Sequence, residues 1–301
     1  MSSERGNRGL GAIGTRQPEA GKGRRMMVIS PNSRGTEKPF LNVEIQVRAD
    51  LDELSRAAAS EVLRQAQRAV QAKGLFSLAL SGGSTPKSLY SLLADDSSFR
   101  AEFPWDKTHF FWGDERHVPP EHPESNYRMA REAMLSKVPI PSENIHRINA
   151  GNPDAQRAAE EYEETLRAFF HLGAGEFPQF DLVLLGMGAD GHTASLFPAT
   201  AALGERKHLV VANWVGKFHV HRITMTLPVI NRAAMVLFLV SGEEKAETLR
   251  RVLADRRGTP PFPSQLIRPI HGRLLWLVDR GAGGFLEGIP SIIISDQSPG
   301  P

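Results

Sequence analysis

The amino-acid sequence predicts an α/β fold: a three-layer, Rossmann-like, doubly wound and mostly parallel sheet with helices on both faces. Short apolar runs recur along the chain, and many are continuous, as is typical of strands buried on both faces. Segments with a helical pattern alternate with these runs, which indicates crossover connections between parallel strands. The chain contains no internal repeat and no convincing linker. We therefore expect a single α/β domain over residues 41–289.

The expected elements follow one another as strand, helix and strand over much of this domain. The first helix is expected to begin after Asp50, because Glu53 follows three residues later as in a capping box, and to run to about Lys73, where Gly74 ends it. Strands are expected at residues 41–47, 75–80, 108–112, 180–186, 208–214, 222–227, 234–240 and 274–278. Later helices are expected near residues 86–94, 125–136, 154–171 and 243–254.

The basic character of the chain is concentrated near its start. Residues 1–40 contain eight lysines or arginines and three glutamates, which gives this segment a net charge of +5. The whole chain carries +2, and the remainder therefore carries −3, which gives no indication of a nucleic-acid partner. We expect residues 1–40 to be a disordered basic tail and residues 290–301 a shorter flexible tail. An organelle transit peptide and a later start at Met26 or Met27 are the alternatives for the first segment.

The composition excludes several classes of site. The chain has no cysteine, which excludes a disulfide framework, a cysteine-ligated zinc site and a cysteine nucleophile. Its longest apolar run, residues 233–240, is far shorter than the roughly 20 residues of a membrane-spanning helix. The sequence therefore predicts a cytoplasmic protein with no membrane partner.

The segment SGGSTP at residues 81–86 directly follows the expected strand 75–80. Ligands of such sheets bind beyond the carboxyl ends of the strands, and free amides at the start of the next helix suit an anion such as phosphate. Thr85 is the expected N-cap of that helix and Pro86 its first residue. A tight turn without a ligand is the alternative. This segment contains neither a Walker motif nor a G-x-G-x-x-G pattern, which disfavours a nucleotide.

A second post-strand segment, GDERHVPPEHPESNYR at residues 113–128, carries a cluster of charges. The Arg116 guanidinium is expected to reach a phosphate or carboxylate while Asp114 and Glu115 hold it in place. A solvated charged loop is the alternative. The histidines near this segment and in HVH at residues 219–221 match no metal-binding motif, and we expect no metal site. The chain also lacks the G-x-S-x-G motif of serine hydrolases.

The segment GMGADGHTASLFP at residues 186–198 follows the apolar run FDLVLL. Its glycines permit a close approach of the backbone to a ligand, and Asp190 and His192 come at the expected ligand edge of the sheet. An imidazole titrates near neutral pH, and His192 is therefore a candidate general base that takes a proton from water. Asp190 orients His192, caps the short helix expected at TASLF, or contacts the substrate. The sequence leaves these three roles open.

Four motifs occur together along the chain: LSGGSTP at residues 80–86, WGDERHVP at 112–119 with SNYR at 125–128, GMGADGHTASLFP at 186–198, and RITMTLPVINRA at 222–233. They resemble the 6-phosphogluconolactonases over residues 41–280, most specifically through DGHTASLFP. The resemblance implies hydrolysis of 6-phospho-D-glucono-1,5-lactone to 6-phospho-D-gluconate, with His192 as the base that activates water on the lactone carbonyl. It implies no metal and no cofactor. The implied partner is the small sugar-phosphate lactone, and a monomer is favoured.

The resemblance also implies a phosphate site around the SGGST segment, Arg116 and Lys217. In this chain KFHVHR replaces the proline-rich spacing that the family usually has before Arg222. Arg222 is a further cationic candidate, with helix-strand packing or a surface salt bridge as its alternative role. The residues expected to bind the substrate or its phosphate are Gly82, Gly83, Ser84, Thr85, Arg116, Lys217 and Arg222.

Two other functions are kept as alternatives. The glucosamine-6-phosphate deaminases share this sheet type and similar SGGSTP and DGH segments. They usually carry an acidic residue shortly after the histidine, where this chain has TASLFP. A non-catalytic sugar-phosphate sensor of the transcription-regulator type needs a helix-turn-helix that reads DNA, and residues 1–40 offer no room for one.

Overall fold

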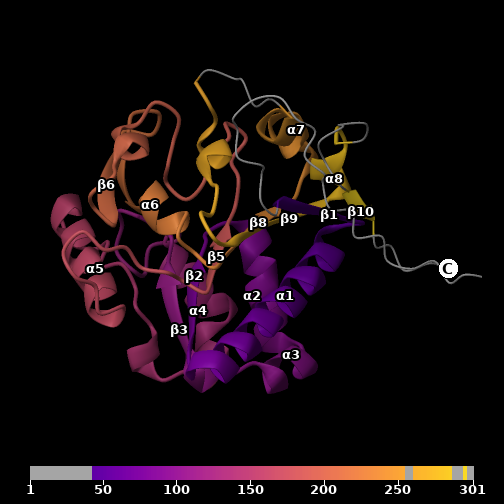
Figure 1. Cartoon of the computed structure of the whole chain (residues 1–301), viewed down its shortest axis with the longest axis horizontal. Coiled ribbons are helices and arrows are strands. Elements are labelled where there is room, and N and C mark those ends of the chain that lie inside the picture. Colours follow the sequence, from indigo (N-terminus) through magenta and orange to yellow (C-terminus); the bar gives the residue numbers. More distant parts are fainter. Residues whose placement is uncertain (1–42, 255–259, 287–293, 297–301) are drawn as a thin grey trace, which may run out of the picture. The chain divides into compact units, whose positions relative to one another are not determined.

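Seven parallel strands form the main sheet of this computed structural model, which describes residues 43–254, 260–286 and 294–296 (Figure 1). The strand order is β10, β1, β9, β8, β5, β2, β3, and every neighbouring pair runs parallel. The strands are β1 (Val43–Arg48), β2 (Phe76–Leu80), β3 (Thr108–Trp112), β5 (Leu182–Leu185), β8 (Met235–Val240), β9 (Arg273–Asp279) and β10 (Ile294–Asp296). This sheet confirms the predicted α/β class and the parallel arrangement.

Helices cover both faces of the sheet. In Figure 1, α1, α2 and α4 lie together on one side of the main sheet, and α7 and α8 lie on the other. The α-helices are α1 (Leu51–Lys73), α2 (Ser84–Asp95), α3 (Ser97–Glu102), α4 (Asn126–Ala133), α5 (Ala155–Phe169), α6 (Leu227–Ile230), α7 (Ala246–Ala254) and α8 (Arg280–Gly283). Among the described residues, no helix combines the length and the apolar character that crossing a membrane requires.

Helix α1 begins and ends as the sequence predicts. The Asp50 carboxylate accepts a hydrogen bond from the backbone N–H of Glu53 at 2.9 Å, and the Glu53 carboxylate accepts one from the N–H of Ala49 at 3.2 Å. Gly74 ends the helix with a φ of 82°, a left-handed conformation that glycine adopts without steric cost. The predicted tail at residues 1–40 lies outside the described residues. Strand β10 falls within the segment predicted as the second tail and pairs with β1.

A second, three-stranded sheet corrects the prediction for residues 208–227. Strands β6 (Val210–Val215) and β7 (Val220–Met225) pair antiparallel with each other, and β7 also pairs with the unpredicted β4 (Asp114–Arg116). Both β6 and β7 had been expected in the mostly parallel sheet. Only residues 216–219 separate them. A connection this short joins antiparallel strands, because a parallel pair needs a crossover of a dozen or more residues.

Two local predictions were wrong. Residues 193–197 form no helix, and their hydroxyl groups bind elsewhere: Ser195 donates to the Asp114 carboxylate at 2.6 Å, and Thr193 donates to the Gly186 carbonyl at 2.8 Å. Ala194, within this segment, has a φ of 48°, a left-handed conformation that a right-handed helix does not contain. Helix α2 begins two residues earlier than expected, and Gly83, with a φ of 104°, occupies the N-cap position predicted for Thr85.

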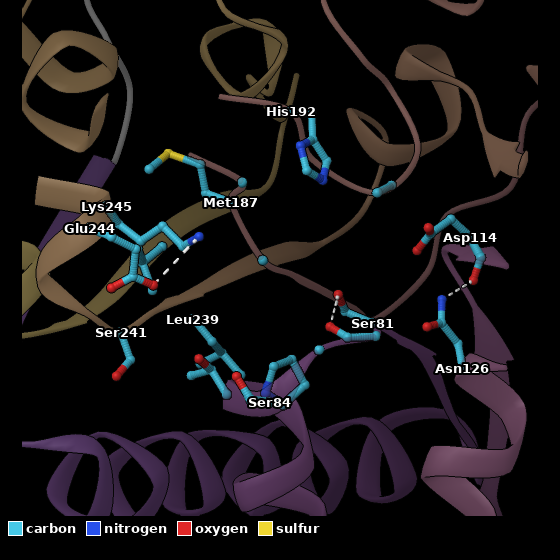
Figure 2. Close-up of a pocket in the computed structure, with 18 of the residues that line it drawn as sticks. Ser81, Ser84, Asp114, Asn126, Met187, His192, Leu239, Ser241, Glu244 and Lys245 are labelled. Atoms are coloured by element: carbon cyan, nitrogen blue, oxygen red, sulfur yellow. Dashed lines mark hydrogen bonds and ion pairs between the residues drawn. The ribbon is translucent and has the colours of Figure 1, made fainter. Parts of the chain in front are cut away.

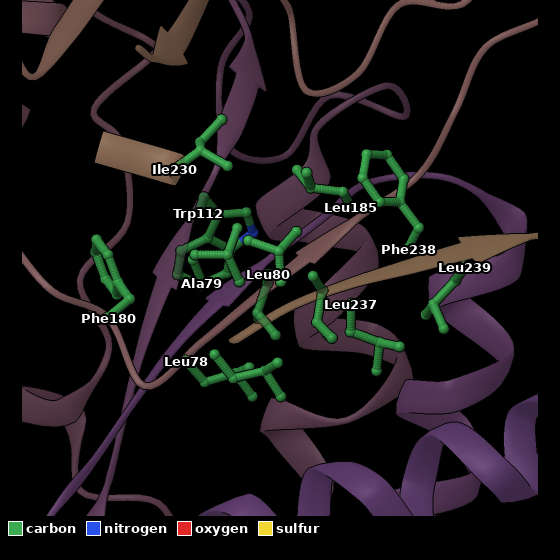
Figure 3. Close-up of a cluster of buried hydrophobic side chains, with 14 of the residues drawn as sticks. Leu78, Ala79, Leu80, Trp112, Phe180, Leu185, Ile230, Leu237, Phe238 and Leu239 are labelled. Atoms are coloured by element: carbon green, nitrogen blue, oxygen red, sulfur yellow. The ribbon is translucent and has the colours of Figure 1, made fainter. Parts of the chain in front are cut away.

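The core is built on the central strands. Every residue of β2, β5 and β8 is buried, as the continuous apolar runs predict. Figure 3 shows side chains from these three strands gathered in one cluster, with Leu80, Leu185 and Leu237 among them. Phe238 of β8 stacks on its cross-strand partner Trp276 of β9 with 3.7 Å between the ring centroids.

Two buried tyrosine hydroxyls complete the backbone hydrogen bonding near the carboxyl ends of β2 and β3. The Tyr90 hydroxyl accepts from the N–H of Ser81 and donates to its carbonyl, both at 2.9 Å. The Tyr162 hydroxyl does the same for Trp112, at 2.8 and 3.1 Å. Because both backbone groups are buried, each hydroxyl replaces the partner that a further strand would supply. Burial raises the pKa of both tyrosines, and they stay neutral.

Replacing Tyr162 by phenylalanine removes the partner of two buried backbone groups while the ring is kept. We expect the substitution Tyr162→Phe to lower the free energy of unfolding by about 1–3 kcal/mol, the usual cost of an unsatisfied buried polar group. The chain offers a matched control in Tyr127, whose hydroxyl has no hydrogen-bond partner within the described residues. Urea denaturation should place Tyr127→Phe within about 0.5 kcal/mol of the unmodified protein. A loss for Tyr162→Phe no larger than the loss for Tyr127→Phe would show that the two hydrogen bonds of the Tyr162 hydroxyl contribute no stability.

Candidate active site

An open cavity of about 230 Å³ lies at the carboxyl edge of the main sheet (Figure 2). Its lining residues belong to or follow the strands β3, β2, β5 and β8, which are neighbours in the sheet. After β2 the chain continues to β3 at one edge of the sheet. After β5 it continues to β8 and then β9, toward the opposite edge. Such a reversal leaves a crevice between the two sets of connections, and ligands of open α/β sheets bind there.

The SGGST segment forms one wall of the cavity. Gly82, Gly83, Ser84 and Thr85 all line it, as predicted. The N-terminus of α2 opens into it, and no side chain within the described residues caps this helix end. The first amides of the helix and its dipole therefore face the cavity without an internal partner, which suits an anion.

The neighbouring SNYR segment packs directly against this wall. A Cβ atom on Gly82 would come within 2.0 Å of the Asn126 side-chain oxygen, and only glycine therefore fits at position 82 without displacing Asn126. The Asn126 amide donates to the Asp114 carbonyl at 2.9 Å. Asn126 and Asp114 both line the cavity, although the sequence singled out neither for that role.

Buried Glu115 holds the SNYR segment on β4. Its carboxylate accepts backbone hydrogen bonds from Arg116, Asn126 and Tyr127 at 2.7–2.8 Å, and a hydroxyl bond from Ser125 at 3.1 Å. Burial raises the pKa of Glu115, and the backbone N–H groups partly oppose this shift. The expectation that Asp114 and Glu115 hold the Arg116 guanidinium was wrong, because these two carboxylates are engaged by Ser195 and by the SNYR segment.

A backbone carbonyl, rather than a carboxylate, holds the Arg116 side chain at the cavity. One guanidinium nitrogen donates to the Glu124 carbonyl at 2.6 Å, and the side chain contributes to the cavity wall. Its cross-strand partner on β7 is Arg222. The Arg222 Nε is buried without a hydrogen-bond partner in the described part of the chain, and burial followed by the nearby Arg116 charge lowers the pKa of Arg222. Two like charges face each other here, and an anion placed between them would relieve their repulsion.

His192 lines the cavity from the opposite wall, after β5. Its Nδ1 lies 2.5 Å from an Asp190 carboxylate oxygen, and its ring stacks on Phe197 with 4.1 Å between the centroids. Gly188 lies directly against the imidazole: a Cβ atom there would come within 2.1 Å of the His192 ring. The glycine loop, predicted to bring the backbone close to a ligand, thus allows the backbone to pass against the imidazole.

Asp190 does not line the cavity, and its carboxylate contacts one imidazole and one ammonium group. Besides His192, it binds the Lys217 ammonium at 3.1 Å. The hydrogen bond from His192, followed by the Lys217 contact, holds the pKa of Asp190 well below its usual value. Of the three roles left open by the sequence, this geometry matches the first, because an ionised Asp190 accepts the Nδ1–H and leaves the Nε2 lone pair of His192 free.

The structure brings some of the expected phosphate ligands together and separates others. Arg116 and the SGGST residues line the cavity, whereas Lys217 and Arg222 do not. A lysine that the sequence analysis did not single out, Lys245, projects into the cavity (Figure 2). It follows β8, and its position after the carboxyl end of a strand is the signal by which it could have been found. No group of three or more histidine and carboxylate side chains among the described residues is arranged to hold a metal ion.

Comparisons with known proteins agree with this arrangement. Residues 49–276 match the family described as "Glucosamine-6-phosphate isomerases/6-phosphogluconolactonase". A 6-phosphogluconolactonase of Nostoc sp. is 45% identical over 244 residues, which cover 81% of this chain and 98% of the relative. A 6-phosphogluconolactonase of Synechocystis sp. is 47% identical over 217 residues, covering 72% and 87% of the two chains.

A solved structure shows the same fold at lower sequence identity. The 6-phosphogluconolactonase of Trypanosoma cruzi superposes with a TM-score of 0.74 at 32% identity, over 84% of this chain and 100% of the other. The matched residues 49–276 include the SGGST wall, the Asp190–His192 pair and Lys245. The chain therefore belongs to the 6-phosphogluconolactonase family, within the wider group that also contains the glucosamine-6-phosphate isomerases.

Proposed function

We propose that the protein hydrolyses 6-phospho-D-glucono-1,5-lactone to 6-phospho-D-gluconate, with His192 as the general base. The observation that carries the proposal is the content of one cavity. An imidazole hydrogen-bonded to a carboxylate lines one wall, and the uncapped N-terminus of α2 opens into the other. A sugar-phosphate lactone has one group for each wall: its carbonyl carbon, which water attacks, suits the imidazole wall, and its phosphate dianion suits the α2 wall. The family of this chain supports the same reaction.

The phosphate is proposed to bind at the SGGST wall. The free amides at the start of α2 supply donors, and Lys245 supplies a positive charge from the segment after β8, which lies two strands away from β2. Glu244 is the counter-ion of Lys245, but the two charges are 3.7 Å apart at a mostly exposed carboxylate, and this pair is weak. A phosphate that displaces Glu244 gains a charge-assisted hydrogen bond. Lys217 stays a predicted phosphate ligand, and its present partner is Asp190.

The chemical steps follow from the state of His192. With Nδ1–H donated to Asp190, Nε2 takes a proton from a water molecule as the water oxygen bonds to the lactone carbonyl carbon. Asp190 stabilises the imidazolium that forms. The carbon–oxygen bond to the ring oxygen then breaks, and that oxygen takes the proton from Nε2. Arg116, backed by Arg222, is proposed to stabilise the negative charge on the carbonyl oxygen.

The first test of the proposal is a lactonase assay of the unmodified protein and of the substitution His192→Ala. Since the base acts in the transition state, we expect kcat to fall by about 10²-fold or more, while binding of the product 6-phosphogluconate is kept. Spontaneous hydrolysis of the lactone has to be subtracted.

The matched control is His271→Ala, because this exposed histidine precedes β9 and therefore lies at the edge of the main sheet opposite to the cavity. It should keep full turnover. Glucosamine 6-phosphate should yield no ammonia. A folded His192→Ala protein with near-normal turnover would rule out the imidazole as the base, and a protein without lactonase activity would overturn the proposed function.

A second prediction separates phosphate binding from chemistry. The substitution Lys245→Ala removes a charge-assisted contact worth about 1.5–3 kcal/mol, and KM for the phosphorylated lactone should rise by about 10- to 150-fold. The unphosphorylated gluconolactone should be affected little. Lys107→Ala is the control, because Lys107 precedes β3 and lies at the opposite edge of the sheet. Equal losses on both lactones would show that Lys245 does not hold the phosphate.

A cytoplasmic location and a monomeric state stay predictions from the sequence. Cell fractionation tests the location, and sedimentation equilibrium tests the oligomeric state. Neither bears on the assignment of the cavity residues.

A further inference from the structure

The tip of the β6–β7 hairpin, residues 216–219, contacts the residues around His192. The tip leaves β6 at Val215, closes with a hydrogen bond from the Phe218 N–H to the Val215 carbonyl at 3.0 Å, and returns at Val220. From this tip the Lys217 ammonium reaches Asp190, the residue that accepts the His192 hydrogen bond. The hairpin belongs to the small sheet, whereas Asp190 and His192 follow β5 of the main sheet.

Phe218 makes a second contact to the same place. Its ring lies edge-on to Phe197, with 5.8 Å between the centroids and an interplanar angle of 78°. Phe197 is buried and stacks in turn on the His192 imidazole. Three rings therefore run from the hairpin tip to the proposed base. Offset-stacked and edge-on contacts of this kind favour a defined relative orientation of the rings.

Two cations hold the Phe218 ring at the tip. The Lys217 Nζ lies 5.3 Å from the ring centroid, and the Arg222 guanidinium carbon lies 5.9 Å from it. Phe218 is 45% exposed, which means that more than half of its surface is covered even at the end of a hairpin. An exposed phenylalanine that contacts a buried ring and two charged groups is ordered by those contacts rather than by burial in the core.

The hydrogen bond to Asp190 alone does not define the plane of the imidazole. It fixes the position of Nδ1, and the ring can still tilt about the axis of that bond. The stack on Phe197 restricts this tilt, and Phe218 packs edge-on against Phe197. We propose that Phe218 is a positioning residue that acts through Phe197 to keep Nε2 of His192 aimed at the attacking water. The inference rests on the proposed function, since it assumes that His192 is the base.

The test compares Phe218→Ala with two other substitutions on the same hairpin. Phe218→Ala should lower kcat by about 5- to 50-fold with less than a twofold change in KM, because a misaligned base affects the transition state more than substrate binding. Phe218→Tyr keeps the ring and should restore turnover. Trp214→Ala is the matched control: Trp214 is 50% exposed on β6, and its ring contacts are to His219 and His221.

A double substitution separates this proposal from the proposed function. If Phe218 acts through His192, adding Phe218→Ala to His192→Ala should lower the residual rate no further. Equal losses of kcat in both backgrounds, or equal losses for Phe218→Ala and Trp214→Ala, would overturn the positioning role while His192 stays the base. If His192→Ala itself retained normal turnover, His192 would not be the base, whatever the effect of Phe218→Ala; a protein without lactonase activity would overturn the proposed function.

Discussion

The reversal of strand order between β2 and β5 is the constraint on which the site depends. All strands of the main sheet run parallel, and their carboxyl ends therefore meet at one edge. The connections diverge at this point and leave the N-terminus of α2 facing the loop that carries His192. Both sides of the gap are fixed by short side-chain bonds to the backbone: Tyr90 holds Ser81 on one side, and Thr193 holds Gly186 on the other. The spacing between anion donors and imidazole is thus set by the sheet.

The charges around the cavity follow a consistent pattern. The carboxylates near it are engaged by other groups: Asp114 by Ser195, Glu115 by the SNYR backbone, and Asp190 by His192 and Lys217. Among the described residues, none of these carboxylates forms an ion pair with Arg116, and the partner of Lys245 is an exposed glutamate. Arg116 and the weakly paired Lys245 are the lysine and arginine side chains of the cavity wall that an anionic ligand can contact. The repulsion between Arg116 and Arg222 is a cost of the unliganded site that binding of an anion relieves.

Much of this arrangement could be predicted from the sequence, because local chemistry sets it. Continuous apolar runs identified the buried strands, and glycine and proline marked the post-strand turns. His192 could be identified because its glycine loop directly follows a strand. Other features depend on partners distant in the chain. The pairing of β4 with β7 joins residues more than a hundred positions apart, and Lys245 enters the cavity only because β8 lies beside β5. The sequence likewise predicted a helix at TASLF, where a serine bonds to the distant Asp114.

We propose that the lactone carbonyl lies beside His192 while the phosphate occupies the start of α2. The most direct measurement is a crystal structure of the unmodified protein with 6-phosphogluconate bound. The phosphate should lie within hydrogen-bond distance of the backbone amides of Ser84 and Thr85 and of the Lys245 ammonium, with C1 of the sugar facing position 192. A phosphate bound beside position 192, with C1 directed to the α2 N-terminus, would contradict this placement.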